Sequence, residues 1–457
     1  MKVSLISPPT SIIDRYPVGH PLRKAKQVTE PLGLAYMAAM IQDIANVEII
    51  DCIAENLNVY ECFTRVFDSD LIGISVVTSN YYTSIKLALA IKKLFPDKTI
   101  IFGGIHSSLY PLEVLRNESI DIVVVGEGEY ALREIVSGNP LEKVKGIVYK
   151  KEGKIIKTSP RPLEKDLDVF PFPARYLLPM KKYKPFLYLR EPVNAIISSR
   201  GCPFSCTYCC RDISGQSYRV RKAEKVIEEI KVLTRQFGSR EIAFQDPIFG
   251  LNRKWLKHFC KLLIAEKIDV VWSALTRVNV VNEELLKLMK RSGCWMLYYG
   301  IEAGNQRLLN VMKKGTTLNM IRKAIKLTID AKIKTWGSFM FALPEETPEF
   351  AEETLAFAKN LKLDFASFHL TTPFRGTELE LTYKQYGVMS NNLRDYTQLN
   401  PVFVPYAWVG REEELKRFYV RAFRSFYFNI RYILRELYRL NSFEELLMYL
   451  KRMDSIF

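Results

Sequence analysis

Three cysteines on one short segment carry the strongest chemical signal in this chain. Cys202, Cys206 and Cys209 stand at the spacing C-x3-C-x2-C. Cysteine thiolates are the usual protein ligands of iron–sulfur clusters, and three of them leave one iron of a four-iron cluster open for chemistry. Zinc is the alternative, but structural zinc sites take four ligands and this segment holds three, with no histidine nearby. The spacing therefore favours a [4Fe-4S] cluster.

The same segment resembles the cluster loop of the radical S-adenosylmethionine (SAM) superfamily, C-x3-C-x-aromatic-C, with Tyr208 at the aromatic position. The resemblance implies that the open iron chelates the amino and carboxylate groups of SAM. It also implies a low-potential electron donor of the flavodoxin or ferredoxin type, whose electron cleaves SAM to a 5′-deoxyadenosyl radical. Cys210 follows directly, and we expect it to pack beside the loop rather than act as a fourth ligand.

The remaining cysteines, Cys52, Cys62, Cys260 and Cys294, stand singly in apolar segments and form no disulfide framework. No secretory leader is recognisable, and no run of about eighteen uncharged apolar residues predicts a transmembrane helix. We therefore expect a protein of the reducing cytoplasm. A chain of 457 residues is long enough for two large domains and an appendage.

The net charge of +16 is spread along the chain, because lysines and arginines alternate with glutamates. No groove-reading or base-stacking motif accompanies this charge, which argues against nucleic acid as a partner. An acidic electron carrier or an anionic substrate suits the same charge.

Short apolar runs alternate with helical stretches in the first third of the chain, which predicts a parallel sheet with helices on both faces. The predicted strands are Val3–Ser7, Val47–Cys52, Leu71–Val77, Thr99–Gly103 and Ile122–Val125, and the predicted helices are Leu34–Ile44, Tyr82–Leu94 and Leu109–Arg116. Ligands of such doubly wound, Rossmann-like sheets lie beyond the carboxyl ends of the strands. Residues 1–145 are therefore expected to bind a ligand the size of a nucleotide or cofactor.

Glycines and polar side chains follow three of these strands. They are Ser75, Thr78 and Ser79, then Gly103, Gly104 and His106, then Gly126 and Glu127. Glycine lets backbone approach a ligand closely, although it is also ordinary turn chemistry. Together these loops resemble the cobalamin-binding domain that precedes the barrel in one large radical SAM class. The resemblance implies that they cradle cobalamin, with His106 bonding the corrin side chains or the loop backbone.

The segment Asp51-Cys52-Ile53-Ala54-Glu55-Asn56 departs from the cobalamin signature D-x-H-x-x-G. Ile53 takes the histidine position, and its side chain cannot coordinate cobalt. The resemblance then implies base-off cobalamin with no protein histidine on its lower face. That arrangement favours reduction to Co(I) and release of a methyl group as a radical.

Residues 146–189 are predicted to be a hairpin followed by a proline-rich linker, since proline interrupts helices and sheets. In residues 190–385, short apolar runs again alternate with helical stretches, and this pattern predicts six strand–helix units. The expected strands are Asn194–Ser199, Glu241–Gln245, Val270–Ala274, Trp295–Gly300, Thr335–Phe341 and Phe365–Leu370. Six units resemble the (β/α)6 partial TIM barrel of radical SAM enzymes.

Functional residues of such barrels belong at the carboxyl ends of the strands. The candidates there are Gln245, Asp246, Ser273, Arg277 and Glu302. SAM carries an ammonium, a carboxylate and a ribose diol, which suit acidic and guanidinium partners. When the family's residues are carried over by position, the resemblance implies that Gln245 or Asp246 binds the amino group of SAM. It implies Arg277 for the carboxylate and Glu302 for the ribose, with an ordinary salt bridge as the alternative at each position.

The turn Phe341-Ala342-Leu343-Pro344-Glu345-Glu346-Thr347 resembles the family pattern G-L-P-G-E-T. Ala342 and Glu345 stand at the two glycine positions of this pattern. We therefore expect the backbone near the adenine of SAM to differ in detail from that of the family.

Residues 386–457 are expected to form a helical extension. One helix is predicted from Glu412 to about Leu440, with an apolar stripe of Phe418, Ala422, Phe426, Ile430, Ile433 and Leu437. We favour docking of this stripe onto the barrel or the substrate mouth, because aromatic residues are spread around the helix. Binding to a membrane surface, which would suit a lipid substrate, is the alternative.

These features predict a cobalamin-dependent radical SAM enzyme that methylates an unactivated carbon through methylcobalamin and a 5′-deoxyadenosyl radical. The substrate class stays open between an organic natural product, a lipid and a peptide. Tyr298 and Tyr299 are candidates for any proton transfer. The alternatives are a cyclase, ring-contraction or carbon–carbon coupling enzyme on a lipid, tetrapyrrole or other natural product, and a non-catalytic cobalamin carrier. An open iron would serve no purpose in a carrier.

Overall fold

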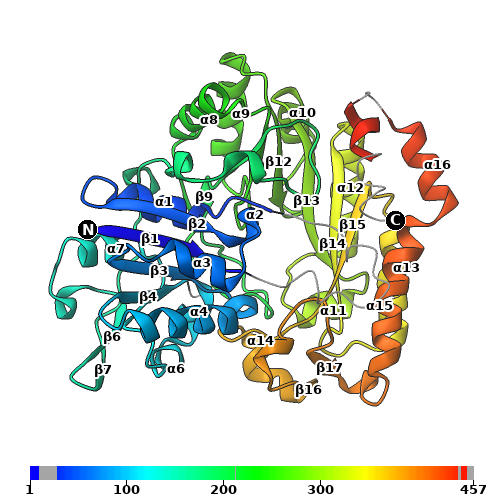
Figure 1. Cartoon of the computed structure of the whole chain (residues 1–457). Helices are drawn as coiled ribbons and strands as arrows, with labels where there is room; N and C mark the ends of the chain where they lie inside the picture. Colours follow the sequence, from blue (N-terminus) through cyan, green and yellow to red (C-terminus); the bar gives the residue numbers. More distant parts are fainter. Residues whose placement is uncertain (10–27, 212, 441–443, 450–457) are drawn as a thin grey trace. The chain divides into compact units, whose positions relative to one another are not determined.

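The computed structural model describes residues 1–9, 28–211, 213–440 and 444–449, and these fold into two compact units. Of the described residues, unit 1 comprises 1–9, 28–184, 211 and 213–219, and unit 2 comprises 185–210 and those from 220 onward. Figure 1 shows both units with their helices and strands labelled. The boundaries predicted at 145, 189 and 385 stay a prediction.

Unit 1 is a seven-stranded sheet in the order β2-β1-β3-β4-β5-β6-β7, with its first five strands parallel. The five parallel strands are β1 (Lys2–Ser7), β2 (Asn46–Asp51), β3 (Leu71–Ser75), β4 (Thr99–Gly103) and β5 (Ile122–Val124). The helices are α1 (Leu32–Ile41), α2 (Cys52–Glu55), α3 (Val59–Arg65), α4 (Tyr81–Leu94), α5 (Ile105–Leu109), α6 (Pro111–Leu115) and α7 (Glu129–Val136). Their apolar side chains bury the sheet, and the predicted doubly wound fold is confirmed.

The hairpin of residues 147–157 extends this sheet. Strand β6 (Ile147–Lys151) pairs antiparallel with β5, and β7 (Lys154–Lys157) pairs with β6. The sequence placed this hairpin in a linker, because edge pairing is a tertiary contact with no local signal. A second difference is the predicted helix Leu109–Arg116, which is divided between α5 and α6 because Pro111 begins a new helix.

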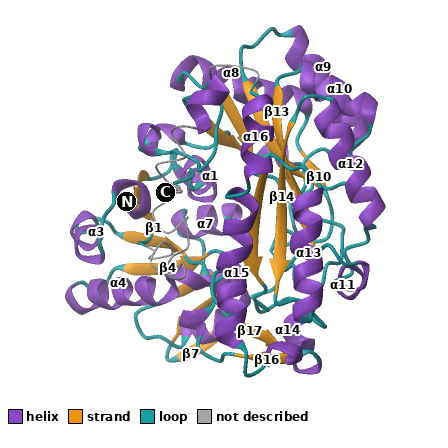
Figure 2. Ribbon diagram, turned by 90° about the vertical axis from the view of Figure 1, so that its right-hand side faces the viewer, coloured by secondary structure: helices purple, strands orange, loops and turns teal. Residues whose placement is uncertain are grey.

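Unit 2 contains a six-stranded parallel sheet in the order β15-β14-β13-β12-β11-β8, which confirms the predicted partial barrel. Its strands are β8 (Val193–Ile196), β11 (Glu241–Phe244), β12 (Val271–Thr276), β13 (Cys294–Glu302), β14 (Lys334–Phe341) and β15 (Phe365–Leu370). Its helices up to the last strand are α8 (Ala223–Phe237), α9 (Arg253–Ala265), α10 (Glu283–Arg291), α11 (Gln306–Val311), α12 (Leu318–Asp330) and α13 (Pro348–Asn360). Strands β13 and β12 form the middle of this sheet, and β14, drawn beside β13 in Figure 2, lies between β13 and the edge strand β15.

After β15 the chain adds α14 (Glu378–Thr382), a small antiparallel pair and two helices. The pair is β16 (Gly387–Met389) with β17 (Phe403–Pro405). Helix α15 (Glu412–Tyr427) lies alongside α13 and against β15 (Figure 2). Of the helices in the described residues, none is both long and apolar enough to cross a bilayer.

The predicted single C-terminal helix is wrong in one respect: it breaks at Asn429. The Asn429 side chain accepts a hydrogen bond from Arg431 N and begins a second helix, α16 (Ile430–Tyr438). The break divides the apolar stripe. Phe418 and Phe426 pack on the aromatic rings of β14 and β15, whereas Ile430, Ile433 and Leu437 are exposed.

Candidate active site

The cysteine loop begins after β8 and is held to two distant elements of unit 2. Thr207 N donates to Met312 O (3.0 Å), just after α11, and Thr207 O accepts from Leu379 N (2.8 Å) in α14. Within the loop, Cys209 N donates to Cys206 O (3.1 Å). These backbone bonds fix the loop without using a thiol.

The three thiols share one site. Partial desolvation and then the neighbouring thiols of Cys206 and Cys202 raise the pKa of Cys209 to about 11. Among the described residues, no three His, Cys, Asp or Glu side chains gather tightly enough to hold a single metal ion. Three thiols on one anchored loop are the donor set of a cluster with one open iron, so these residues fit a [4Fe-4S] cluster.

Arg277 lies beside this loop, beyond the end of β12. Its Nη1 is 3.6 Å from Cys206 Sγ, and its Cζ is 3.7 Å from the ring centroid of Phe204. The guanidinium also donates to the carbonyl of Lys314. A buried cation beside the loop suits a cluster that is held by negatively charged thiolates, whether or not Arg277 also binds a carboxylate.

Glu302, at the end of β13, is the centre of a buried polar cluster. Its Oε1 accepts from Tyr208 Oη (3.0 Å) and from Lys314 Nζ (2.7 Å), and Lys314 Nζ also donates to Tyr208 Oη (3.1 Å). A Cβ atom on Gly300 would lie 2.6 Å from Glu302 Oε1, so a side chain at position 300 would have to displace this carboxylate. The cluster ties the strand-end carboxylate to the cysteine loop.

Lys314 was not among the sequence candidates. It stands in Lys313-Lys314-Gly315, one of many basic positions, and no spacing separates it from the others. Only the fold shows that Lys314 is buried while Lys313 is exposed.

Asp246 is committed to the protein rather than presented to a ligand. Its carboxylate accepts from Ser198 N (2.6 Å), from the Ser198 hydroxyl and from Ser199 Oγ (2.9 Å). Burial raises the pKa of Asp246 to about 6. Gln245, in contrast, is exposed just beyond β11. Of the two candidates for the SAM amino group, the structure leaves Gln245 available, and Asp246 orders the chain that leads from β8 into the cysteine loop.

The other barrel candidates differ in the face of the sheet that they occupy. Ser273 is buried in β12, and Tyr298 packs on Trp336 of the neighbouring strand β14, with ring centroids 5.1 Å apart. Tyr299 points the opposite way, because neighbouring side chains of a strand alternate. Its hydroxyl bonds Thr328 Oγ1 (2.8 Å) in α12, so we propose no proton transfer for Tyr299.

The turn after β14 keeps a glycine-like backbone without its glycines. Ala342 has φ 57° and Glu345 has φ 63°, both in the left-handed region that glycine adopts without cost. Glu346 Oε1 accepts from Ala342 N (2.6 Å), and burial raises the pKa of Glu346 to about 8. The substitutions therefore add strain but keep the shape of the turn.

In unit 1 the predicted loops lie at the carboxyl edge of the parallel strands. Gly104 has φ 91°, and a Cβ there would lie 2.8 Å from Val76 O, so this position requires glycine. A Cβ at Gly103 or Gly126 would meet no protein atom within 4 Å, which leaves open space for a ligand. Ser75, Thr78 and Ser79 lie half-buried at the same edge. The loops fit a cofactor that contacts backbone.

His106 is held by the segment that follows β3 and by aromatic neighbours. Its Nδ1 is 3.2 Å from Thr78 Oγ1, and its ring lies between those of Tyr81 and Tyr110, at centroid distances of 4.2 and 4.6 Å. The side chain is buried. The expected bond of His106 to the corrin side chains or to the loop backbone stays a prediction.

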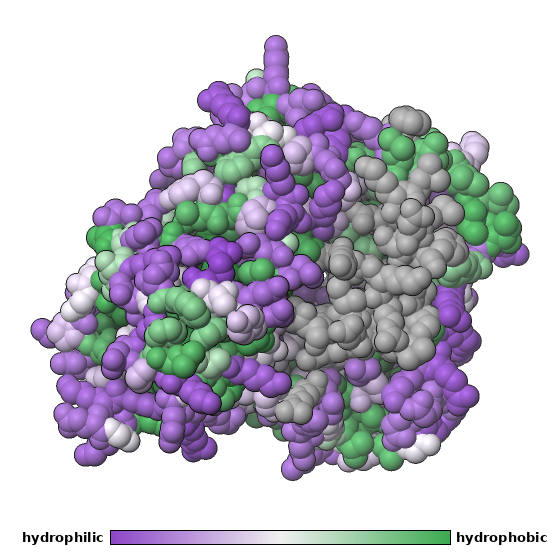
Figure 3. Space-filling view, viewed as in Figure 1, coloured by the Kyte–Doolittle hydropathy of each residue, from purple (hydrophilic) through white to green (hydrophobic). Residues whose placement is uncertain are grey.

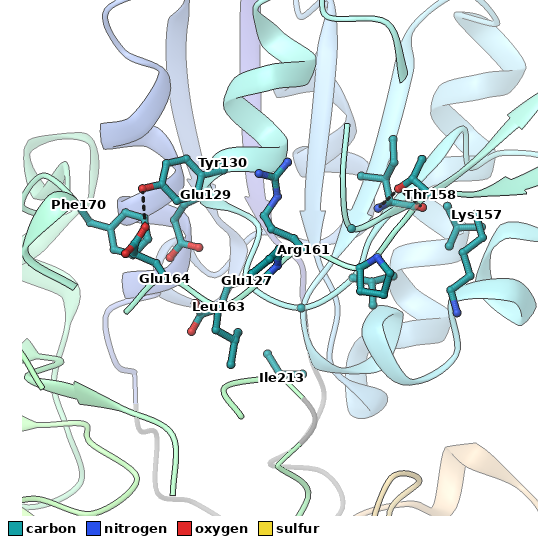
Figure 4. Close-up of a pocket in the computed structure, with 17 residues that line it drawn as sticks. Glu127, Glu129, Tyr130, Lys157, Thr158, Arg161, Leu163, Glu164, Phe170 and Ile213 are labelled. Carbon is teal, nitrogen blue, oxygen red and sulfur yellow. Dashed lines mark hydrogen bonds between the residues drawn. The ribbon is translucent and has the colours of Figure 1, made fainter. Parts of the chain in front are cut away.

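Glu127 is already paired, because Arg219 donates to both of its oxygens (2.6 and 2.9 Å). Figure 4 shows the adjoining cavity of about 230 Å³, lined by the β5–α7 loop and by residues 157–164, where the Tyr130 hydroxyl donates to Glu164 (3.0 Å). The ion pair fixes the loop around Gly126 and leaves backbone facing the cavity.

In the segment 51–56, the first and last positions of the cobalamin signature D-x-H-x-x-G, Asp51 and Asn56, have the backbone roles that the signature residues would have. Asp51 caps α2 by accepting from Ile53 N and Ala54 N, and its other oxygen accepts from Tyr183 Oη (2.9 Å). Asn56 has φ 58°, the conformation expected of the signature glycine. Ile53, at the histidine position, is 38% exposed and offers no ligand to a metal.

Comparisons with known proteins agree with both sites. Residues 21–136 match the B12 binding domain, and residues 196–358 match the Radical SAM superfamily. An uncharacterized methyltransferase of Pyrococcus horikoshii is 34% identical over 97% of this chain and 96% of its own length. The chain belongs to the cobalamin-dependent radical SAM enzymes. Its predicted cofactors are thereby confirmed as a [4Fe-4S] cluster, SAM and cobalamin.

Two further relatives show the breadth of this family. The anaerobic magnesium-protoporphyrin IX monomethyl ester cyclase of Rubrivivax gelatinosus is 29% identical over 87% of this chain and 74% of its own. The structure of OxsB, a cobalamin-dependent S-adenosylmethionine radical enzyme, superimposes with a TM-score of 0.75 at 17% identity. It covers all of this chain and 71% of OxsB, and it supports the fold of the enzyme.

Proposed function

We propose that this radical SAM enzyme is a C-methyltransferase acting on an unactivated carbon of an organic, lipid or peptide substrate. The observation that carries the proposal is the full-length likeness to the methyltransferase of P. horikoshii, which spans both units. When bound, the cluster and SAM supply a hydrogen-abstracting radical, and cobalamin supplies the methyl group.

The residues of unit 1 support a cobalamin without a protein imidazole below the cobalt. His106 is the one histidine among the described residues of this unit, and it is enclosed by Tyr81 and Tyr110. Ile53 occupies the position at which the signature carries the coordinating residue. A weak lower ligand eases loss of a methyl group from cobalt, which suits methyl transfer to a carbon radical.

The residues of unit 2 bind and orient SAM. The Arg277 guanidinium pairs with the carboxylate of SAM, and the Gln245 amide oxygen accepts a hydrogen bond from the SAM ammonium. The Glu302 carboxylate accepts a hydrogen bond from a ribose hydroxyl of SAM. Lys314 and Tyr208 hold the Glu302 carboxylate in place, so the acceptor is oriented before SAM arrives. Such prior ordering reduces the entropy lost on binding.

We place the enzyme in the cytoplasm with a low-potential electron donor of the flavodoxin or ferredoxin type. All eight cysteines are free thiols, which suits a reducing compartment. The net charge of +16 attracts an acidic carrier.

The test is an anaerobic reconstitution with iron, sulfide and cobalamin, followed by incubation with methyl-deuterated SAM and a low-potential reductant. We expect 5′-deoxyadenosine, S-adenosylhomocysteine and deuterated methyl on the bound cobalamin. Cys206→Ala should lose cluster iron and 5′-deoxyadenosine, whereas the matched variant Cys210→Ala should keep both. Deoxyadenosine with cobalamin that is never methylated would refute methyl transfer and favour the cyclase reaction, which the relative from R. gelatinosus represents.

A further inference from the structure

Helix α16 carries apolar side chains that unit 2 does not cover. Ile430 is 65% exposed, Leu434 59% and Leu437 57%, and Ile433 and Tyr438 are exposed as well. Figure 3 shows a hydrophobic patch at the right-hand edge, where α16 lies in Figure 1. Exposed apolar groups at this density mark a surface that docks onto something apolar.

The inner side of α16 is already used to hold the helix on the barrel. Arg435 donates to Leu363 O, and Arg439 donates to Lys362 O (3.2 Å). Tyr432 Oη donates to Asp364 O (2.6 Å). Because these bonds fix the rotation of the helix, the exposed apolar side chains form a defined outer face.

A cationic groove on α15 meets this apolar face at Phe428. The groove is lined by Lys416, Arg417, Arg421 and Arg424, and Phe428 also lines it. Glu413 pairs with Lys416 and Glu352 pairs with Arg421, so these carboxylates neutralise part of the charge and cations remain in excess. Phe428 is 48% exposed and lies two residues before Ile430, the first residue of α16. The two surfaces are therefore continuous, with cations along one side and apolar side chains along the other.

We propose that α16 and the adjoining groove of α15 dock this enzyme on the surface of an anionic lipid bilayer. Charge complementarity decides the occupant, because a second copy of this chain would bring a second cationic groove to the interface. Interfacial helices combine an apolar face, which enters the headgroup boundary, with cations that attract anionic headgroups. The proposal concerns a docking surface and does not depend on which reaction the enzyme catalyses.

The test measures co-sedimentation of the full-length protein with vesicles of phosphatidylcholine alone or mixed with about a third phosphatidylglycerol. We expect binding to the mixed vesicles that falls steeply with added salt. Leu434→Ser with Leu437→Ser should weaken binding at least tenfold, since both side chains are exposed and their loss removes buried apolar area. Arg417→Gln should weaken it roughly fivefold.

Leu381→Ser is the matched control, because Leu381 is 81% exposed but belongs to α14, away from this surface. Its vesicle binding should equal that of the unaltered protein, and thermal unfolding should confirm that all variants fold. Failure of the unaltered protein to sediment with mixed vesicles would overturn the proposal. So would equal binding by the double-leucine variant, or a dimer in solution that this variant dissociates.

Discussion

Removing the ammonium of Lys314 tests whether the buried cluster around Glu302 is held together by charge. Lys314 Nζ lies 2.7 Å from Glu302 Oε1, and both side chains are buried. At an effective dielectric constant of roughly 20, two unit charges at this distance attract by about 6 kcal/mol. Desolvation opposes much of this attraction, but deletion of one partner leaves the other charge buried and alone.

We expect Lys314→Met, which keeps most of the side-chain volume, to lower the free energy of unfolding by about 3 kcal/mol. Lys313→Met is the matched control next to it. Lys313 pairs with Glu378 at 2.6 Å, but both side chains of this pair are exposed to solvent, so this loss should cost less than about 0.5 kcal/mol.

The assay is urea unfolding followed by tryptophan fluorescence under anaerobic, reducing conditions. All five tryptophans of the chain, Trp255, Trp272, Trp295, Trp336 and Trp408, lie in unit 2, so the signal reports that unit. The double variant Lys314→Met with Glu302→Gln should recover about 2 kcal/mol relative to the sum of the two single changes. Equal costs at Lys313 and Lys314, or strict additivity in the double variant, would refute the reasoning.

Three further predictions concern other buried groups of unit 2 and use the same assay. Asp246→Ala leaves the donors of Ser198 without their acceptor and should cost about 3 kcal/mol, whereas Asp246→Asn keeps one acceptor and should cost about 1 kcal/mol; equal costs would contradict the assigned bonds. Burial raises the pKa of Glu346 from 4.5 to about 8, so the folded protein keeps a proton that the unfolded chain loses, and stability should fall as pH rises between these values. Glu346→Gln should remove about 3 to 5 kcal/mol of that fall, and parallel pH profiles for the two proteins would contradict it. Ala342→Gly should change stability by less than about 1 kcal/mol, because relief of the left-handed backbone offsets the lost methyl group. Ala366→Gly, in a strand, should cost about 1.5 kcal/mol, and a larger loss at Ala342 than at Ala366 would argue against strain in the turn.

The sequence by itself determined the architecture and the chemistry. Short apolar runs that alternate with amphipathic stretches predict parallel sheets, because each element must bury one face against the next. The spacing of Cys202, Cys206 and Cys209 predicts the cluster, since three ligands on one loop need no distant partner. Both signals are local, which is why they can be read from neighbouring residues.

Tertiary structure alone decided which polar side chains are available to a ligand. Gln245 and Asp246 are neighbours in sequence, but only the approach of the chain after β8 commits Asp246 to Ser198 and Ser199. The same holds for Lys313 and Lys314, of which one is buried against Glu302. Burial and hydrogen-bond partners come from residues far apart in the chain, so no local pattern can assign them.

The C-terminal helix shows the same division. Its apolar stripe was visible in the sequence, but the break at Asn429 and the bonds of Arg435 and Arg439 decided which half of the stripe is covered. A helix cap is a local device, yet the direction that the next helix takes depends on the surface that it meets. The exposed face of α16 is therefore a property of the folded barrel, whereas its apolar composition is a property of the sequence.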